Sequence, residues 1–119
     1  MYQVTFSVGC GLNRKEEPLD DLAARIQAAL NYIADSFGGC TVTSGLGAWK
    51  DETGRLITEQ CRVFTSDISG LPPGVYLRTM ADKTAGALRD IFYQTAVHVT
   101  ITEVKTWDRY EKETVFVED

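Results

Sequence analysis

The sequence predicts an α+β fold of the ferredoxin-like, split βαβ type, in which a four-stranded antiparallel sheet carries two helices on one face. Residues 2–8 alternate strictly between apolar and polar side chains, two later segments repeat apolar residues every three or four positions, and an acidic turn at residues 51–54 joins two strand-like runs. The order is therefore strand, helix, strand, strand, helix, strand. The 119 residues suffice for one domain with one hydrophobic core, which we assign to residues 1–119.

The first strand and the first helix follow from these periodicities. In residues 2–8 the apolar side chains occupy every second position, so they share one face of a strand. Pro18 suits the first turn of a helix, because the N–H that proline lacks has no partner there. Apolar residues then recur at helical spacing up to Phe37, and Gly38 with Gly39 predicts the end of the helix.

The middle of the chain predicts a hairpin. Residues 40–48 form a second strand, and the turn at residues 51–54 leads into a third strand over about residues 55–65. We expect Ile57, Cys61 and Val63 to face the core, which also places Glu59 on the core side. The other parity assigns four side chains to the open face of the sheet: Thr58, Gln60, Arg62 and Phe64.

The last third of the chain completes the pattern. Residues 69–74 contain two prolines and predict a loop, and a second helix is expected to begin near Ala81 or Asp82. Residues 97–104 alternate again and predict the fourth strand. Residues 105–119 form a charged tail that can add an edge strand or dock on a neighbouring subunit.

Composition limits the possible partners. The formal charge of −5 and the sequence pI of about 4.8 disfavour general binding to nucleic acid or anionic membranes. The chain shows no basic leader and no spanning apolar run, so we expect a cytoplasmic protein of a bacterial cell or a phage-infected host. Cys10, Cys40 and Cys61 have no metal-ligand spacing, so we expect reduced, structural thiols, with no metal and no cofactor.

The open face of the predicted sheet is rich in hydroxyl and amide groups and poor in lysine and glutamate. A face exposed to bulk water usually carries more charge, so we expect another subunit or a ligand to cover this one. Arg62 and His98 are the candidate chemical groups there. Arginine offers a planar set of donors for phosphate or carboxylate, and histidine exchanges protons near neutral pH.

The hairpin itself is a second candidate. Two glycines precede Trp49, which offers a flat stacking surface, and Lys50 and Arg55 place positive charge on both sides of the turn. These residues can hold a nucleotide-like anion. Equally, Trp49 can pack over the edge of the sheet while the glycines shape a bulge. The run lacks the spacing of a phosphate-binding P-loop.

The segment SGLGAWKDETGRLITEQ at residues 44–60 resembles a family of small uncharacterised bacterial and phage proteins. Their shared pattern is glycine, one or two residues, tryptophan, an acidic turn ending in glycine, and a strand bearing glutamate. The resemblance implies a ferredoxin-like fold and no assigned reaction. At the level of fold, the chain is also similar to small oligomeric proteins that bind metabolites or nucleotides between subunits, including phage proteins that sequester immune signalling nucleotides.

These observations lead to a preferred function and two alternatives. We expect a non-enzymatic homo-oligomer that senses or sequesters a small anionic ligand between subunits, with a signalling nucleotide as one candidate. The expected ligand-binding residues are Trp49, Lys50, Arg55, Gln60, Arg62 and His98. The first alternative is a small enzyme of the dimeric α+β barrel type, with His98 as acid or base and Arg62 binding an oxyanion. The second is a structural or protein-interaction module.

Overall fold

The computed structural model describes residues 2–68 and 75–104, and its six elements follow the predicted order. They are β1 (Tyr2–Gly9), α1 (Leu22–Phe37), β2 (Thr41–Lys50), β3 (Leu56–Ile68), α2 (Val75–Ile91) and β4 (His98–Glu103). The strands form a sheet in the order β2-β3-β1-β4, and all neighbouring pairs are antiparallel. The predicted ferredoxin-like class is confirmed.

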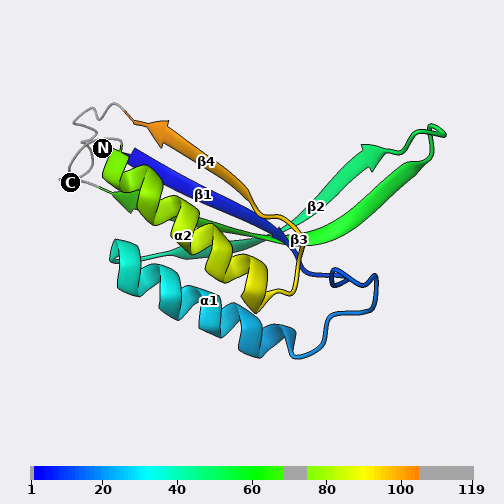
Figure 1. The fold of residues 1–119 in the computed structure, drawn as a ribbon, viewed down its shortest axis with the longest axis horizontal. Helices are drawn as coiled ribbons and strands as arrows, with labels where there is room; N and C mark the ends of the chain where they lie inside the picture. The colour runs from blue at the N-terminus through cyan, green and yellow to red at the C-terminus, as the bar shows by residue number, and fades with distance from the viewer. Residues whose placement is uncertain (1, 69–74, 105–119) are drawn as a thin grey trace, which may run out of the picture.

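Both helices cover the same face of the sheet (Figure 1), where α1 packs on β3 and α2 packs on β1 and β4. The core between these layers is aromatic at its centre. Phe6 packs against Phe37 with ring centroids 6.1 Å apart, and Phe64 packs against Phe92 at 5.9 Å. The open face of the sheet has no helix over it in the described part of the chain.

The register confirms the predicted faces of β1 and contradicts those of β3. Val4, Phe6 and Val8 are buried under the helices as expected. Phe6 pairs with Phe64 and Val8 pairs with Arg62, and directly paired residues share a face. Phe64 is therefore a core residue, and the open-face assignment of Phe64 is wrong.

The whole of β3 is shifted to the other face by the same register. Gln60 and Arg62 lie on the side of the helices, whereas Glu59, Cys61 and Val63 lie on the open face. The sequence pattern misled here because the first residues of β3 are not covered by the helices. Leu56 is exposed and Ile57 is half-buried, so apolar residues in that stretch do not mark the core side.

Both helices begin elsewhere than expected. α1 begins at Leu22, since Pro18 forms an isolated bridge with Leu12 and Asp21 adopts a left-handed conformation with φ 50°. α2 begins at Val75, before the expected start near Ala81. The end of α1 agrees with prediction, because Gly38 takes φ 95° and donates its N–H to the Ala34 carbonyl.

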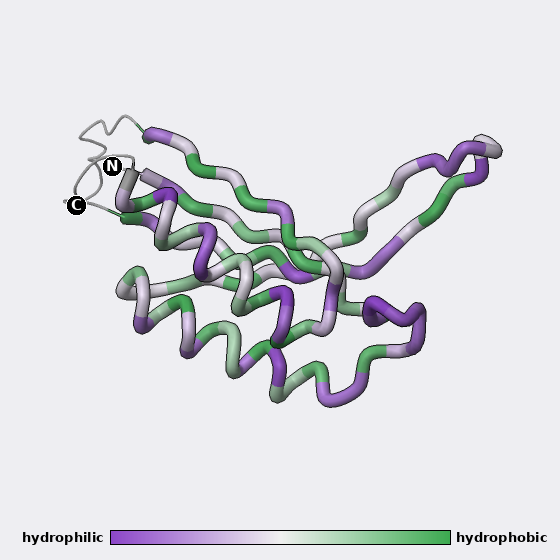
Figure 2. The backbone as a smooth tube through the Cα atoms, in the orientation of Figure 1, coloured by the Kyte–Doolittle hydropathy of each residue, from purple (hydrophilic) through white to green (hydrophobic). Residues whose placement is uncertain are grey.

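β2 and β3 continue past the end of β1 as a two-stranded ribbon, seen at the upper right of Figure 1. We call residues 46–60 the arm. Its turn is closed as predicted, with Gly54 at φ 84° and the Asp51 carboxylate accepting bonds from the backbone N–H groups of Thr53 and Arg55. Figure 2 shows a hydrophilic tip with a hydrophobic stretch of β3 behind it.

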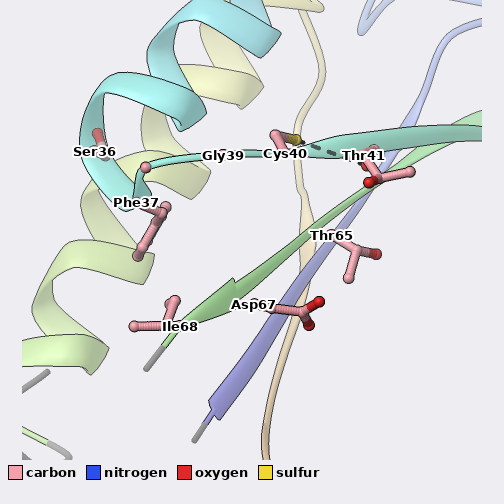
Figure 3. A pocket seen from close by; sticks show the side chains of 9 residues that line it. Ser36, Phe37, Gly39, Cys40, Thr41, Thr65, Asp67 and Ile68 are labelled. Atoms are coloured by element: carbon pink, nitrogen blue, oxygen red, sulfur yellow. Dashed lines mark hydrogen bonds between the residues drawn. The ribbon is translucent and has the colours of Figure 1, made fainter. Parts of the chain in front are cut away.

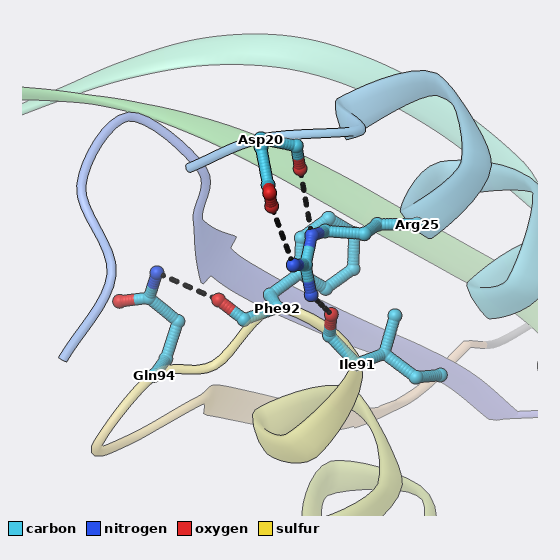
Figure 4. Close-up of polar contacts among 5 residues, drawn as sticks. All are labelled: Asp20, Arg25, Ile91, Phe92 and Gln94. Atoms are coloured by element: carbon cyan, nitrogen blue, oxygen red, sulfur yellow. Dashed lines mark hydrogen bonds and ion pairs between the residues drawn. The ribbon is translucent and has the colours of Figure 1, made fainter. Parts of the chain in front are cut away.

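Two polar side chains tie the helices to the loops (Figure 4). Arg25 of α1 donates to the Ile91 carbonyl at the end of α2 and to both the carbonyl and the carboxylate of Asp20. Gln94, which is buried, donates to the carbonyls of Leu12 and Phe92. These bonds fix the end of the domain from which the arm projects. Among the described residues, neither helix has the length and hydropathy needed to cross a membrane.

Candidate functional site

The open face of the sheet carries the unusual chemistry of the described residues. By register, its side chains include many hydroxyls, two carboxylates, one imidazole and neither lysine nor arginine. The polar members are Gln3, Thr5, Ser7, Thr41, Thr43, Glu59, Thr65, Asp67, His98, Thr100 and Thr102. Asp67 accepts a hydrogen bond from Gln3 at 3.0 Å. Glu59, which is half-buried, has neither an ion pair nor a hydrogen bond to the described residues.

Three glycines surround Glu59 on this face. A Cβ added to Gly9 would lie 2.3 Å from the Glu59 Oε2, so the Glu59 side chain lies across the backbone of Gly9. Gly47 is the direct partner of Glu59 on β2. Gly45 pairs with Cys61, and a Cβ there would lie 3.0 Å from the Cys61 Sγ. The missing side chains leave a smooth floor on which a flat ligand can approach the backbone.

Trp49 lies next to these glycines on the open face. It pairs with Ile57, and the pair Trp49–Ile57 follows Gly47–Glu59 on the same face of the arm. Diagonal neighbours in an antiparallel pair lie about 7–8 Å apart, within reach of an aromatic side chain. Trp49 is 51% exposed, so its ring is available for stacking beside the Glu59 carboxylate.

The structure brings together only some of the predicted site residues. Trp49 and His98 share the open face, but His98 pairs with Ser7, two strands across and four residues along β3 from Glu59. That separation is on the order of 15 Å. Lys50 and Gln60 have the opposite parity on the arm, and Arg55 lies in the turn, where its Nε is 3.6 Å from the Asp51 carboxylate.

Arg62 and His98 do not meet, which corrects the expected pairing of these two groups. Arg62 lies on the side of the helices and donates to the Cys10 Sγ at 3.4 Å and the Cys61 carbonyl at 3.5 Å. Burial raises the pKa of the Cys10 thiol, and Arg62 partly opposes this effect. Burial also raises the pKa of the Cys40 thiol. All three cysteines are free, and the described residues contain no cluster of metal-ligating side chains.

Glu59 is the residue that the sequence interpretation misplaced. The available signal was a single carboxylate within a parity otherwise made of Ile57, Cys61 and Val63, opposite a run of glycines on β2. A charged residue at such a position is costly in a core and useful on a binding face. These four residues do share one face of β3, as predicted, but that face is the open one and not the core.

Two hollows lie elsewhere in the described structure. One of about 430 Å³ lies between the end of α1 and the adjoining ends of β2 and β3 (Figure 3), and one of about 370 Å³ lies between α2 and the start of β4. Neither contains Glu59.

Comparison with known proteins gives a structural match alone. No family model matches the chain, and no curated protein matches it. A phage SAM lyase in complex with S-methyl-5′-thioadenosine superposes with a TM-score of 0.64 at 20% identity, over 86% of this chain and 80% of that one. A phage SAM lyase in the apo state superposes with a TM-score of 0.63 at 16% identity, over 92% of both chains.

These matches show a shared fold, and they correct the expected class of function. The prediction of a non-enzymatic sensing or sequestering protein is contradicted, because two structures that share this fold, over 86% and 92% of this chain, are those of an enzyme, phage SAM lyase. The preference against catalysis is contradicted by the same finding. A small ligand is consistent with the bound nucleoside in the first of these structures.

Proposed function

We propose that this protein is a lyase that cleaves S-adenosylmethionine and releases S-methyl-5′-thioadenosine. The observation that carries the proposal is the match in fold, over 86% of the chain, to a phage SAM lyase holding that nucleoside. The position of Glu59 supports it independently. An unpartnered carboxylate on a glycine floor beside an exposed tryptophan suits a cationic nucleoside.

The chemistry follows from the substrate and the product. S-methyl-5′-thioadenosine keeps the methyl and adenosyl groups, so the bond that breaks joins the sulfonium sulfur to the γ carbon of the amino acid portion. Both electrons of that bond go to sulfur, which becomes neutral. A lyase adds no water, so an oxygen of the substrate's own carboxylate attacks the γ carbon and forms α-amino-γ-butyrolactone. One molecule gives two, with no cofactor and no net proton transfer.

Glu59 is expected to bind a substrate group whose positive charge does not change during the reaction. A carboxylate beside the sulfonium would favour the ground state, because the sulfur loses its positive charge in the transition state. The α-ammonium keeps its charge throughout. We therefore assign Glu59 to the ammonium, where it holds the amino acid portion bent with its carboxylate facing the γ carbon. Trp49 stacks on the adenine, and the floor of Gly9 and Gly47 lets both groups lie close to the sheet.

We also propose that the active form is a homo-oligomer in which a second copy packs against both faces of the arm. Trp49 is exposed on the open face of the arm, and on its opposite face Leu46 is 70% exposed and Leu56 is 59% exposed. An exposed apolar group of this kind is typical of an interaction surface. The substrate carboxylate needs donors, and the open face has neither lysine nor arginine. Lys50 and Arg55 at the tip of a second arm would supply them.

The activity is tested by incubating the purified protein with S-adenosylmethionine and separating the products by liquid chromatography with mass detection. We expect equal amounts of S-methyl-5′-thioadenosine and the lactone. Glu59→Gln should lower kcat/KM by about 100-fold, equivalent to about 2.7 kcal/mol of lost charge-assisted bonding. Glu103→Gln, the same change on exposed β4, should leave kcat/KM within about twofold.

Two results would contradict these proposals separately. Homoserine that carries ¹⁸O from labelled water as the first product, with no preceding lactone, would show a hydrolase instead of a lyase. A monomer in sedimentation at the concentration of the assay, with full activity, would exclude the shared site and leave the lyase reaction intact. Leu56→Lys should disrupt the oligomer and the activity together if the arm completes the site.

A further inference from the structure

The hollow of about 430 Å³ lies at the end of the sheet away from Glu59. Thr65, one of its lining residues, is six positions along β3 from Glu59, which corresponds to about 20 Å. A molecule in this hollow therefore cannot touch the proposed catalytic groups. The lining residues are Ser36, Phe37, Gly38, Gly39, Cys40, Thr41, Thr65, Asp67 and Ile68.

The hollow exists because β3 extends beyond β2 at this end of the sheet. Thr41 pairs with Thr65, so the last three residues of β3 have no partner on β2. The chain crosses this gap through Gly38 and Gly39, and an added Cβ at either position would meet nothing within 4 Å. Ser66, buried beneath the turn, donates its hydroxyl to the Gly39 carbonyl at 2.6 Å and holds the backbone in place. The opening is thus built by fixed backbone.

The charge of the hollow is negative. Asp67 contributes a carboxylate, and no lysine, arginine or histidine lies among the lining residues. The last turn of α1 carries no basic residue, so the negative end of its dipole is not neutralised locally. The Ala34 carbonyl of that turn accepts the Gly38 N–H, and the carbonyls that follow it lie beyond the reach of the helical pattern and can accept bonds from a ligand. These features favour a cation.

The two sides of the hollow differ in chemistry. Figure 3 shows Thr65 and Asp67 pointing to one side of β3 and Ile68 pointing to the other, toward Phe37. The Phe37 ring is fixed by its contact with Phe6. An ammonium group gains from a carboxylate on one side and from an aromatic ring on the other. A molecule with two ammonium groups joined by a short methylene chain can contact both.

We propose that this hollow is a binding site for a small aliphatic diamine, separate from the proposed catalytic site. The proposal does not depend on lyase activity. The carboxylate of Asp67 holds one ammonium group, and the end of α1, with its carbonyls and the ring of Phe37, receives the methylene chain and the second ammonium. The volume is within the range of known small-molecule sites.

The test is an amide NMR titration of the full chain with putrescine, alongside butylamine and glutarate. We expect saturable shifts at Gly38, Gly39 and Thr41 with a Kd in the millimolar range, about −4 kcal/mol. Butylamine should bind more weakly, and glutarate should cause no shifts at these amides. Asp67→Asn keeps an acceptor for Gln3 and should weaken putrescine about fivefold.

The matched control is Asp82→Asn on exposed α2, which removes the same charge outside this hollow and should change the Kd by less than about twofold. Phe37→Leu should weaken putrescine while leaving butylamine less affected. If Phe37→Leu does not fold, Asp67→Asn still decides the question. Shifts that stay linear with concentration, shifts centred on Glu59, or equal losses in Asp67→Asn and Asp82→Asn would each overturn the proposal.

Discussion

The two faces of the sheet differ in what their side chains contact. On the covered face, Phe6 and Phe64 are fully buried and pack against Phe37 and Phe92 of the helices. On the open face, the neighbouring side chains are mostly hydroxyls, and Glu59 lies over a glycine. Packing fixes the identity of residues on the first face. The second face is free of that demand, so its residues are available for binding and catalysis.

The largest difference in stability is expected between substitutions of two neighbouring residues of β3 that point to opposite faces. Phe64→Ala removes a fully buried ring and should lower the free energy of unfolding by about 3–5 kcal/mol. Thr65→Ala, one position on, should lower it by less than about 1 kcal/mol. Urea unfolding followed by circular dichroism measures both. Similar losses in the two variants would mean that both faces are packed to the same degree.

A smaller effect on the free energy of unfolding is expected from the hydrogen bonds of Arg25, which connect the two helices. Arg25→Met keeps the apolar stem but removes the hydrogen bonds to Ile91 and Asp20, which should cost about 2 kcal/mol of unfolding free energy. Gln27→Met, an exposed change on the same helix, provides the control and should cost less than about 0.5 kcal/mol. Equal stability of the two variants would show that α1 is held by its apolar stripe alone.

On the open face, activity should respond where stability does not. Gly9→Ala places a methyl group where the Glu59 carboxylate lies, so the carboxylate must move. We expect kcat/KM to fall about tenfold, while the free energy of unfolding changes by less than about 1 kcal/mol. Gly39→Ala, with open space around its Cβ, should keep kcat/KM. Unchanged activity in Gly9→Ala would remove Glu59 from the site.

The smallest effect concerns pH. Burial raises the pKa of the Cys10 thiol above the ordinary value of 9.0, so the unfolded chain ionises first as pH rises. The contribution of Cys10 to stability is therefore full below about pH 9 and is lost as pH rises through the folded pKa. Unfolding curves between pH 8 and 10 should show a shallower decline in Cys10→Ala than in the wild type. Parallel curves would contradict this assignment.

The comparison of faces also explains what the sequence could predict. The alternation of β1 identified its buried face, because helices cover that strand along its whole length. The same reasoning failed on β3, where the residues used to set the parity included Ile57 of the uncovered arm. Trp49 was recognised from its chemistry alone. Glu59 was assigned to the wrong face because its surroundings come from two other strands, with Gly47 as its partner on β2 and the backbone of Gly9 beneath its carboxylate.

β3 runs without interruption from the tip of the arm into the centre of the sheet. An insertion of one residue between Glu59 and Phe64 would turn the β3 side chains of the arm to the other face, moving the carboxylate to the side of the helices. Insertions of two residues would keep the faces. The arm can therefore change in length during evolution only if each side chain keeps its face. Related chains should differ here by even numbers of residues, matched on β2 and β3.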